Sequence, residues 1–111
     1  MAGAYVQPWT SNDGAVVGSL SLTVSGATSG NLLVAAVGVR GGGDVFTTPT
    51  GWTLMEDFSS GDFGGAAYYR IATGDSNDNF NPSWTDTGRA QAMVTEYSGL
   101  DGTSPFEDSG E

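Results

Sequence analysis

The side chains in this chain that could do chemistry are carboxylates, because the sequence contains no histidine, no cysteine and no lysine. Thirteen carboxylates stand against three arginines, Arg40, Arg70 and Arg89, which gives a formal net charge of −10. The chain therefore lacks the residues of an acyl-transfer triad, a Schiff base or a histidine-liganded metal centre. Only a pair of carboxylates, as glycosidases use, stays available for catalysis.

Most of these carboxylates lie in turns rich in glycine and serine, where acidic residues are common for conformational reasons. Glu96 is the exception, since it lies on an expected strand beside Val94 and Tyr97. An ion pair with Arg70 or Arg89, or exposure to solvent, is favoured there over a catalytic role. The sequence therefore predicts a protein that is not an enzyme and has no catalytic residues.

A second candidate chemistry is calcium binding by the segment "DSNDN". Asp75, Asn77 and Asn79 alternate along it, and Asp86 follows further along the chain. Hard oxygen ligands at alternate positions suit Ca²⁺, but Phe80 occupies the position at which an EF-hand loop needs glycine. Asp and Asn are also ordinary turn residues. We therefore expect a turn without a cofactor, with calcium binding by these four acidic and amide residues as the alternative.

Exposed aromatic side chains offer a third possibility, because sugar-binding β-sandwiches stack sugar rings on them. Trp52 and Trp84 are expected in the core, since a domain this small needs large side chains there. Trp9 follows Pro8 near the N-terminus and is expected to be exposed. It is the candidate residue for binding a surface glycan.

Charge and hydropathy limit the partners of the chain. A net charge of −10 repels nucleic acid and anionic membrane surfaces. No apolar run approaches the roughly 20 residues of a membrane helix, and the start of the chain has no signal-peptide pattern. We expect no nucleic-acid partner and no membrane insertion. A composition typical of extracellular β modules, without a signal peptide, indicates a virion protein that is made in a host cytoplasm and works in an extracellular particle.

The elements that must position these side chains are predicted to be short strands. Eighteen glycines are spread through the 111 residues, and no helical apolar period holds for three turns. Polar and apolar residues alternate in "SLSLTV" and "RAQAMVTEYSG", as in half-buried antiparallel strands, and "GAAYYRIA" is a further strand. Pro49 and Gly51 predict a turn that places Trp52 at a strand start. About six or seven strands predict an all-β, antiparallel β-sandwich or jelly roll over residues 1–99, with an acidic tail over residues 100–111.

The stretch "NLLVAAVGVR" is apolar on both faces of its expected strand. One face carries Leu33, Ala35, Val37 and Val39, and the other carries Leu32, Val34, Ala36 and Gly38 before Arg40. An antiparallel sandwich strand normally leaves one face for water. Something is therefore expected to cover Leu32 and Val34, either a loop or tail of the same chain or a neighbouring subunit. Leu32, Val34 and Phe106 of the tail are the predicted interface residues.

Several segments occur together in an order that resembles a known module. They are "GNLLVAAVGVR", "TPTGWTL", "AAYYRIATG" and "FNPSWTDTGRAQAMVTEYSGLDGTSPFE". The set is similar to a β-sandwich module that recurs in bacteriophage virion proteins and in large bacterial surface proteins, and the similarity runs from about Gly30 to Pro105. What the family implies is a structural or adhesive role, with no catalytic residues to carry over.

The resemblance implies a non-enzymatic structural virion protein of a bacteriophage, in a capsid decoration or cement position or as a fibre or tail component. Its expected mechanism is protein–protein assembly with copies of itself, as a homo-oligomer, or with a capsid or tail scaffold protein. The alternative is a glycan-binding or adhesion module of a phage tail or a bacterial surface protein. Such modules usually continue with further strands after the Y-S-G-x-D segment, so either N-terminal strands close the fold or an edge is open for a partner.

Overall fold

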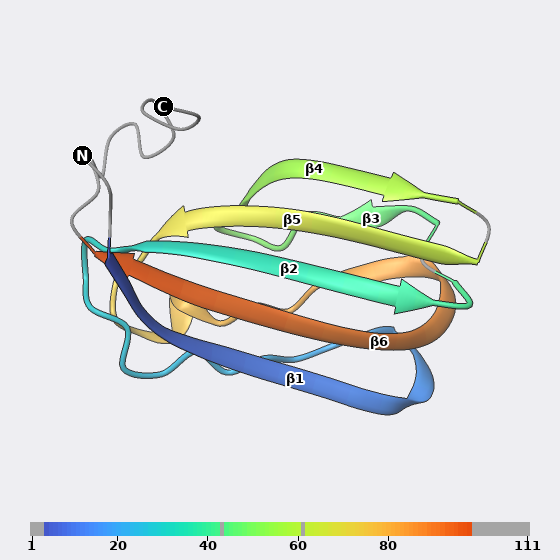
Figure 1. Ribbon diagram of the computed structural model, residues 1–111, viewed down its shortest axis with the longest axis horizontal. Helices are drawn as coiled ribbons and strands as arrows, with labels where there is room; N and C mark the ends of the chain where they lie inside the picture. The colour runs from blue at the N-terminus through green and yellow to red at the C-terminus, as the bar shows by residue number, and fades with distance from the viewer. Residues whose placement is uncertain (1–3, 43, 61, 99–111) are drawn as a thin grey trace.

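The computed structural model describes residues 4–42, 44–60 and 62–98, which form one six-stranded antiparallel sheet (Figure 1). The strand order is β1-β6-β2-β5-β4, and β3 pairs with β6 off this path. The strands are β1 Ala4–Ser19, β2 Leu32–Arg40, β3 Phe46–Thr47, β4 Thr53–Ser59, β5 Phe63–Ile71 and β6 Ser83–Ser98. A 3₁₀ turn, η1, covers Ser76–Asp78, and the described part of the chain contains no α-helix. None of its helical segments has the length and apolar character that a membrane crossing requires.

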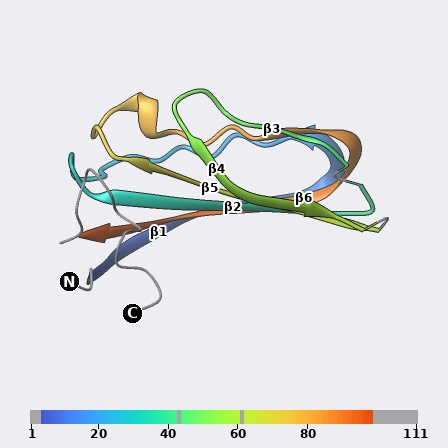
Figure 2. The same cartoon turned by 90° about the horizontal axis from the view of Figure 1, so that it is seen from above.

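The two longest strands carry the chain from one layer into a second. β1 and β6 are each 16 residues long and bend at the same end of the sheet (Figures 1 and 2). Beyond the bend Ser19 pairs with Ser83, and β3 adds to this second layer through its pairing with β6. The rest of the layer is irregular chain with one isolated bridge, between Leu22 and Phe80. The all-β antiparallel class is thus confirmed, while the second layer of the described residues is not a closed sheet.

One face of the sheet lies against this second layer and holds the hydrophobic core; we call it the covered face (Figure 2). Phe80 lies at the centre of the core, with its ring centroid 5.1 Å from that of Trp52 and 5.6 Å from that of Tyr68. Trp52 and Trp84 are buried, so the prediction of two core tryptophans is confirmed. The four residues of β2 that were expected on one face are all buried there: Leu33, Ala35, Val37 and Val39.

The strand and turn predicted around β2 and Trp52 are confirmed, whereas the strand predicted at "SLSLTV" is not. β2 begins and ends close to the predicted bounds, and the predicted turn forms, with the Trp52 N–H donating to the Pro49 carbonyl at 3.1 Å and Gly51 at φ +87°. In "SLSLTV" the residues Leu20, Leu22 and Val24 are buried and those between them are exposed, as the alternation predicts. The separate strand predicted there is nevertheless wrong, because Ser19 ends β1 and the rest of the segment forms only the Leu20 N–H hydrogen bond to the Pro82 carbonyl and the isolated Leu22–Phe80 bridge.

Candidate functional site

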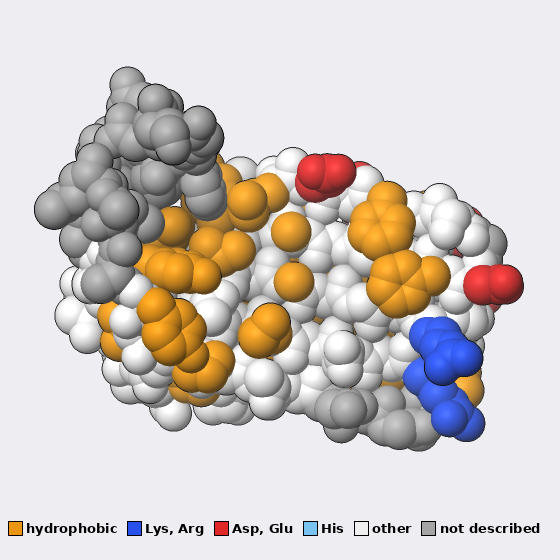
Figure 3. All heavy atoms as spheres, in the orientation of Figure 1, with side chains coloured by type: hydrophobic (Ala, Val, Ile, Leu, Met, Phe, Trp, Pro, Cys, Tyr) orange, Lys and Arg blue, Asp and Glu red, His pale blue; other side chains and the backbone are white. Residues whose placement is uncertain are grey.

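The second face of the same sheet carries no described segment of the chain; we call it the open face (Figure 2). It is formed by Leu32, Val34, Ala36, Gly38 and Arg40 of β2 and by the residues level with them on the neighbouring strands. Several apolar side chains on it are between 44% and 61% exposed: Tyr5, Val16, Phe58, Phe63 and Met93. Figure 3 shows apolar side chains distributed along the whole length of this face.

Two phenylalanine rings lie directly on glycines at one end of the open face. A Cβ added to Gly38 would lie 3.3 Å from Cζ of Phe63, and one added to Gly65 would lie 2.8 Å from Cε1 of Phe58. The two ring centroids are 5.5 Å apart. Rings placed in this way cover strand backbone that has no side chain of its own. They border a shallow hollow of about 250 Å³ that is also lined by Ala36 of β2, by small residues of β5 and by Glu56 of β4.

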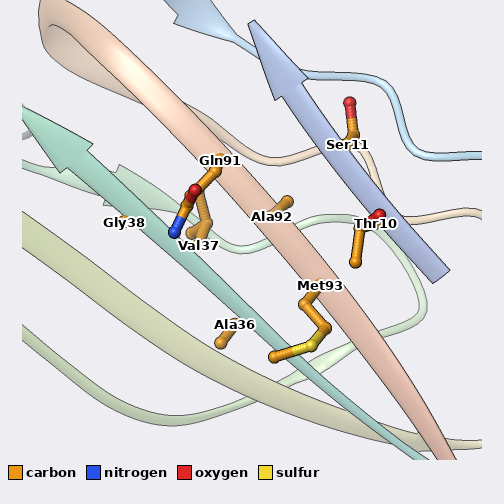
Figure 4. A pocket seen from close by; sticks show the side chains of 8 residues that line it. All are labelled: Thr10, Ser11, Ala36, Val37, Gly38, Gln91, Ala92 and Met93. Carbon is orange, nitrogen blue, oxygen red and sulfur yellow. The ribbon is translucent and has the colours of Figure 1, made fainter. Parts of the chain in front are cut away.

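A second hollow, of about 390 Å³, lies between β1, β2 and β6 (Figure 4). The side chains of Gln91 and Met93 extend from β6 toward β2, and Thr10 faces them from β1 (Figure 4). Ala36 and Gly38 of β2 contribute only a methyl group and backbone to its lining. The centre of the open face is therefore a hollow that is lined by small or uncharged side chains.

Two arginines occupy one end of the open face. Arg40 on β2 and Arg89 on β6 are register partners, and Phe63 and Val16 flank them on β5 and β1, so that the four side chains form one row across the sheet. Both arginines are exposed, and neither forms an ion pair or a side-chain hydrogen bond with a described residue. They line a hollow of about 410 Å³ together with Gly88. Figure 3 shows the arginines of this face as a single patch beside apolar side chains.

Arg70, the third cation, lies on the covered side and has a structural role. Its Nε lies 3.1 Å from Oδ1 of Asp78 as an ion pair without hydrogen-bond geometry, and its Nη1 donates to the Asn77 carbonyl at 2.6 Å. Asp78 is fully buried and accepts the backbone N–H groups of Thr73 and Gly74 at 3.0 and 2.8 Å. This network fixes the turn around η1 against β5.

Glu96 is fully buried on the covered face, and amides rather than arginines are its partners. Gln7 Nε2 donates to Oε1 at 2.9 Å, and the Thr28 N–H and Asn31 Nδ2 each donate to Oε2 at 2.8 Å. Burial raises the pKa of Glu96, but these three hydrogen bonds outweigh burial and hold the pKa below its ordinary value. The expectation of an arginine partner or of solvent exposure is therefore wrong, because the carboxylate joins β1 and β6 to the chain before β2.

The residues considered for calcium are engaged by their own chain. Asp75 Oδ1 accepts the Asn77 N–H at 3.0 Å and the Thr73 hydroxyl at 2.7 Å, and the Thr73 hydrogen bond lowers the pKa of Asp75. Asn79 Oδ1 accepts the Val24 N–H at 2.9 Å, while Asp86 lies apart on β6 at φ +67°. The described residues contain no group of three or more Asp, Glu, His or Cys suited to a metal. Calcium binding by Asp75, Asn77, Asn79 and Asp86 stays an untested prediction.

The residues predicted to form an interface or to bind a glycan are less exposed than expected where the structure describes them. Leu32 is on the open face but only 3% exposed, and Val34 is half-buried, so the chain itself covers Leu32, and the exposed apolar area lies elsewhere on this face. Phe106 lies outside the described residues. Trp9 is half-buried, packs against the core and donates from Nε1 to the Ser25 carbonyl at 3.1 Å, which differs from the exposed placement expected for glycan binding.

No family model matches the chain, and no curated protein or solved structure is significantly similar to it.

Proposed function

We propose that this protein is a non-enzymatic structural component of a bacteriophage particle, in a capsid decoration, fibre or tail position, and that it assembles through the open face of its sheet. The bacteriophage context comes from the resemblance of residues 30–105 to a β-sandwich module of virion and bacterial surface proteins. In this proposal the irregular second layer is the counterpart of the second sheet of that sandwich or jelly roll. The protein is made in the host cytoplasm and works in the extracellular particle.

The observation that supports assembly is the exposed apolar character of the open face. A sheet face that only contacts water normally carries polar side chains. Here Phe58, Phe63 and Met93 are 52%, 44% and 46% exposed on the same face of the sheet. Exposed apolar area gathered on one face supports a protein–protein interface there. Small exposed residues such as Ala36 also let another surface approach the sheet closely.

The partner that we propose is a second copy of this chain. A chain of net charge −10 repels its copies at a distance, so self-association needs a short-range contribution that outweighs this repulsion. Burial of apolar area contributes about 25 cal/mol for each Å² removed from water. The open face supplies such area, and its arginines supply the opposite charge that an acidic copy requires.

The test compares two variants that add one negative charge at an exposed apolar residue. Met93→Glu changes the centre of the open face, and Val45→Glu changes a residue that is 59% exposed beside β3 in the second layer. Sedimentation equilibrium of the full chain should show self-association at high micromolar concentration. Met93→Glu should abolish it, and Val45→Glu should leave it close to the wild-type value.

A wild-type chain that stays a monomer throughout that concentration range overturns the proposal. So does equal weakening by the two variants, because it would assign the effect to net charge rather than to the open face. Circular dichroism melting of each variant confirms that the comparison is made between folded proteins.

A further inference from the structure

We propose that Arg40 and Arg89 form a docking site for the carboxylates of the C-terminal acidic segment, residues 104–111, of a second copy of this chain. This inference rests on the proposed function, because it names the contact by which copies of the chain recognise one another.

The two guanidinium groups are placed together without a counter-charge from any side chain that the structure describes. Residues directly opposite on antiparallel strands have Cβ atoms about 4.5–5.5 Å apart, and like charges at that separation destabilise the pair. Asp62 is near, since its carbonyl accepts the Gly41 N–H at 2.7 Å, yet its carboxylate forms no ion pair with Arg40. In a chain with thirteen carboxylates, the described fold thus leaves two cations side by side on an exposed surface. A bound carboxylate would relieve their repulsion.

The surroundings of the pair suit a carboxylate that is attached to an apolar group. The planar guanidinium binds a carboxylate through two parallel N–H donors. Val16 and Phe63 place apolar side chains at the two ends of the row, and the hollow beside the pair measures about 410 Å³. The smaller hollow beneath the two phenylalanine rings, of about 250 Å³, adjoins the same row at Phe63. An aromatic side chain followed by an acid therefore finds a matching surface.

The C-terminal segment "SPFEDSGE" has this chemistry. Phe106 is followed directly by Glu107 and Asp108. Pro105 biases the residue before it toward an extended backbone, which suits a peptide lying along a sheet. Side chains of an extended peptide alternate between its two sides, so Asp108 is the acid that shares a side with Phe106 and would meet the arginine pair when Phe106 lies beside Phe58 and Phe63.

Chain length favours a neighbouring copy over the same chain as the source of this segment. Arg89 lies nine residues before Ser98 on β6, a distance of about 30 Å along a strand. Glu107 lies nine residues after Ser98 and reaches about 30 Å only when fully extended. Since the segment must also reverse direction after β6, Phe106 and Glu107 fall short of the arginines of their own chain. The same residues of a second copy are free of this limit. Glu111, thirteen residues after Ser98, spans about 43 Å when extended, so the mixing experiment below separates a contact within one chain from docking of a second copy.

The first experiment neutralises the site in the full chain. The double variant Arg40→Gln/Arg89→Gln and the control Thr48→Asp/Asn81→Asp each change the net charge by −2 from −10, and the control residues are exposed away from the open face. Sedimentation velocity at low salt should show self-association weakened at least about tenfold per arginine, the size of one charge-assisted hydrogen bond. The control should stay within about twofold of wild type, as expected for exposed charges distant from a site.

The second experiment identifies the occupant by exchanging the charges. The face variant is Arg40→Glu/Arg89→Glu, and the tail variant is Glu107→Arg/Asp108→Arg. Each alone should be monomeric, since its face and its tail carry charges of the same sign. An equimolar mixture should associate, because each face then meets a tail of opposite sign on the other variant.

The outcomes separate this inference from the proposed function. A wild-type chain that never associates overturns both. Wild-type association that the glutamine variant weakens no more than its control leaves assembly through the open face standing and overturns the arginine site. A tail variant that associates as wild type, or a mixture that stays monomeric, overturns the C-terminal segment of a second copy as the occupant; the monomeric mixture is also the result expected of an intrachain contact.

Discussion

The buried carboxylate of the covered face is hydrogen-bonded within the fold, whereas the two arginines of the open face are exposed and form no ion pair with a described residue. On the covered face Glu96 is fully buried and accepts three hydrogen bonds from amide groups. On the open face Arg40 and Arg89 are exposed and lie opposite each other on β2 and β6. No described residue forms an ion pair with the guanidinium group of either arginine. A buried charge must be satisfied within the fold, because its desolvation would otherwise be costly. A charge left unpaired at the surface is instead available to a partner.

Side chains are also packed more tightly on the covered face than on the open face. Phe80 is fully buried between two other aromatic rings, whereas Phe63 is 44% exposed and rests on a glycine. Large interlocking side chains hold the second layer in place, while small residues leave hollows in the open face. The difference indicates that stability resides on the covered face and association on the open face. Equivalent substitutions on the two faces should therefore have different consequences.

The largest contrast is expected from removing one phenylalanine ring on each face. Phe80→Ala should lower the free energy of unfolding by about 4 kcal/mol, because a buried aromatic ring leaves a cavity in the core. Phe63→Ala should lower it by less than about 1 kcal/mol, as for a substitution away from the core, but should weaken self-association. Urea unfolding followed by fluorescence gives the first quantity, and sedimentation gives the second. Equal destabilisation by the two variants would show that the faces are energetically alike.

The next largest effect is expected at the buried carboxylate of the covered face. Glu96→Gln should lower the free energy of unfolding by about 3 kcal/mol near neutral pH, because hydrogen bonds to a buried charge are lost. The folded-state pKa of Glu96 is lower than its unfolded value, so its contribution is complete above the ordinary value of 4.5 and is lost as the pH falls through the folded-state pKa.

The matched control for this carboxylate is Glu56→Gln, which neutralises an exposed residue of the edge strand β4. Unfolding curves of wild type and both variants between neutral pH and pH values below 4.5 make the comparison. The gap between wild type and Glu96→Gln should narrow as the pH falls, whereas the Glu56→Gln gap should stay small throughout. A gap at Glu96 that does not change with pH would contradict a charged carboxylate in the folded state.

Local alternation in the sequence was sufficient to predict which side chains of β2 and β6 share a face. Met93 and Ala36, for example, fall on the open face as their alternation requires. The side-chain period of a strand depends only on neighbouring residues, so it can be recognised without knowledge of the pairing. The turn before Trp52 is predictable for the same reason, since proline and glycine act on their own backbone.

What depends on pairing between distant segments was not predictable. β1 has no clear alternation, and Pro8 lies within it, which is tolerated because β1 is at an edge of the sheet. The contact between Arg40 and Arg89 exists only through the register of β2 with β6. The partners of Glu96 likewise come from β1 and from the chain before β2, and no local pattern indicates them.

The smallest effect, and the finest test of the comparison, is expected at glycines of neighbouring strands. A Cβ on Gly88, on the covered side of β6, would lie 2.6 Å from the Arg40 carbonyl oxygen and 2.8 Å from Cγ1 of Val39. Gly88→Ala should therefore cost about 2 kcal/mol, since backbone must move to accommodate it. A Cβ on Gly38 would meet only the ring of Phe63, at 3.3 Å.

Because Phe63 is 44% exposed, its ring can move away from an alanine at position 38 without disturbing the strands. Gly38→Ala should change the free energy of unfolding by less than about 0.5 kcal/mol, as surface substitutions commonly do. Thermal and urea unfolding of both alanine variants provide the measurement. A loss at Gly38 as large as that at Gly88 would mean that the phenylalanine rings are locked in place, and the open face would then be packed as a core rather than left adaptable for a partner.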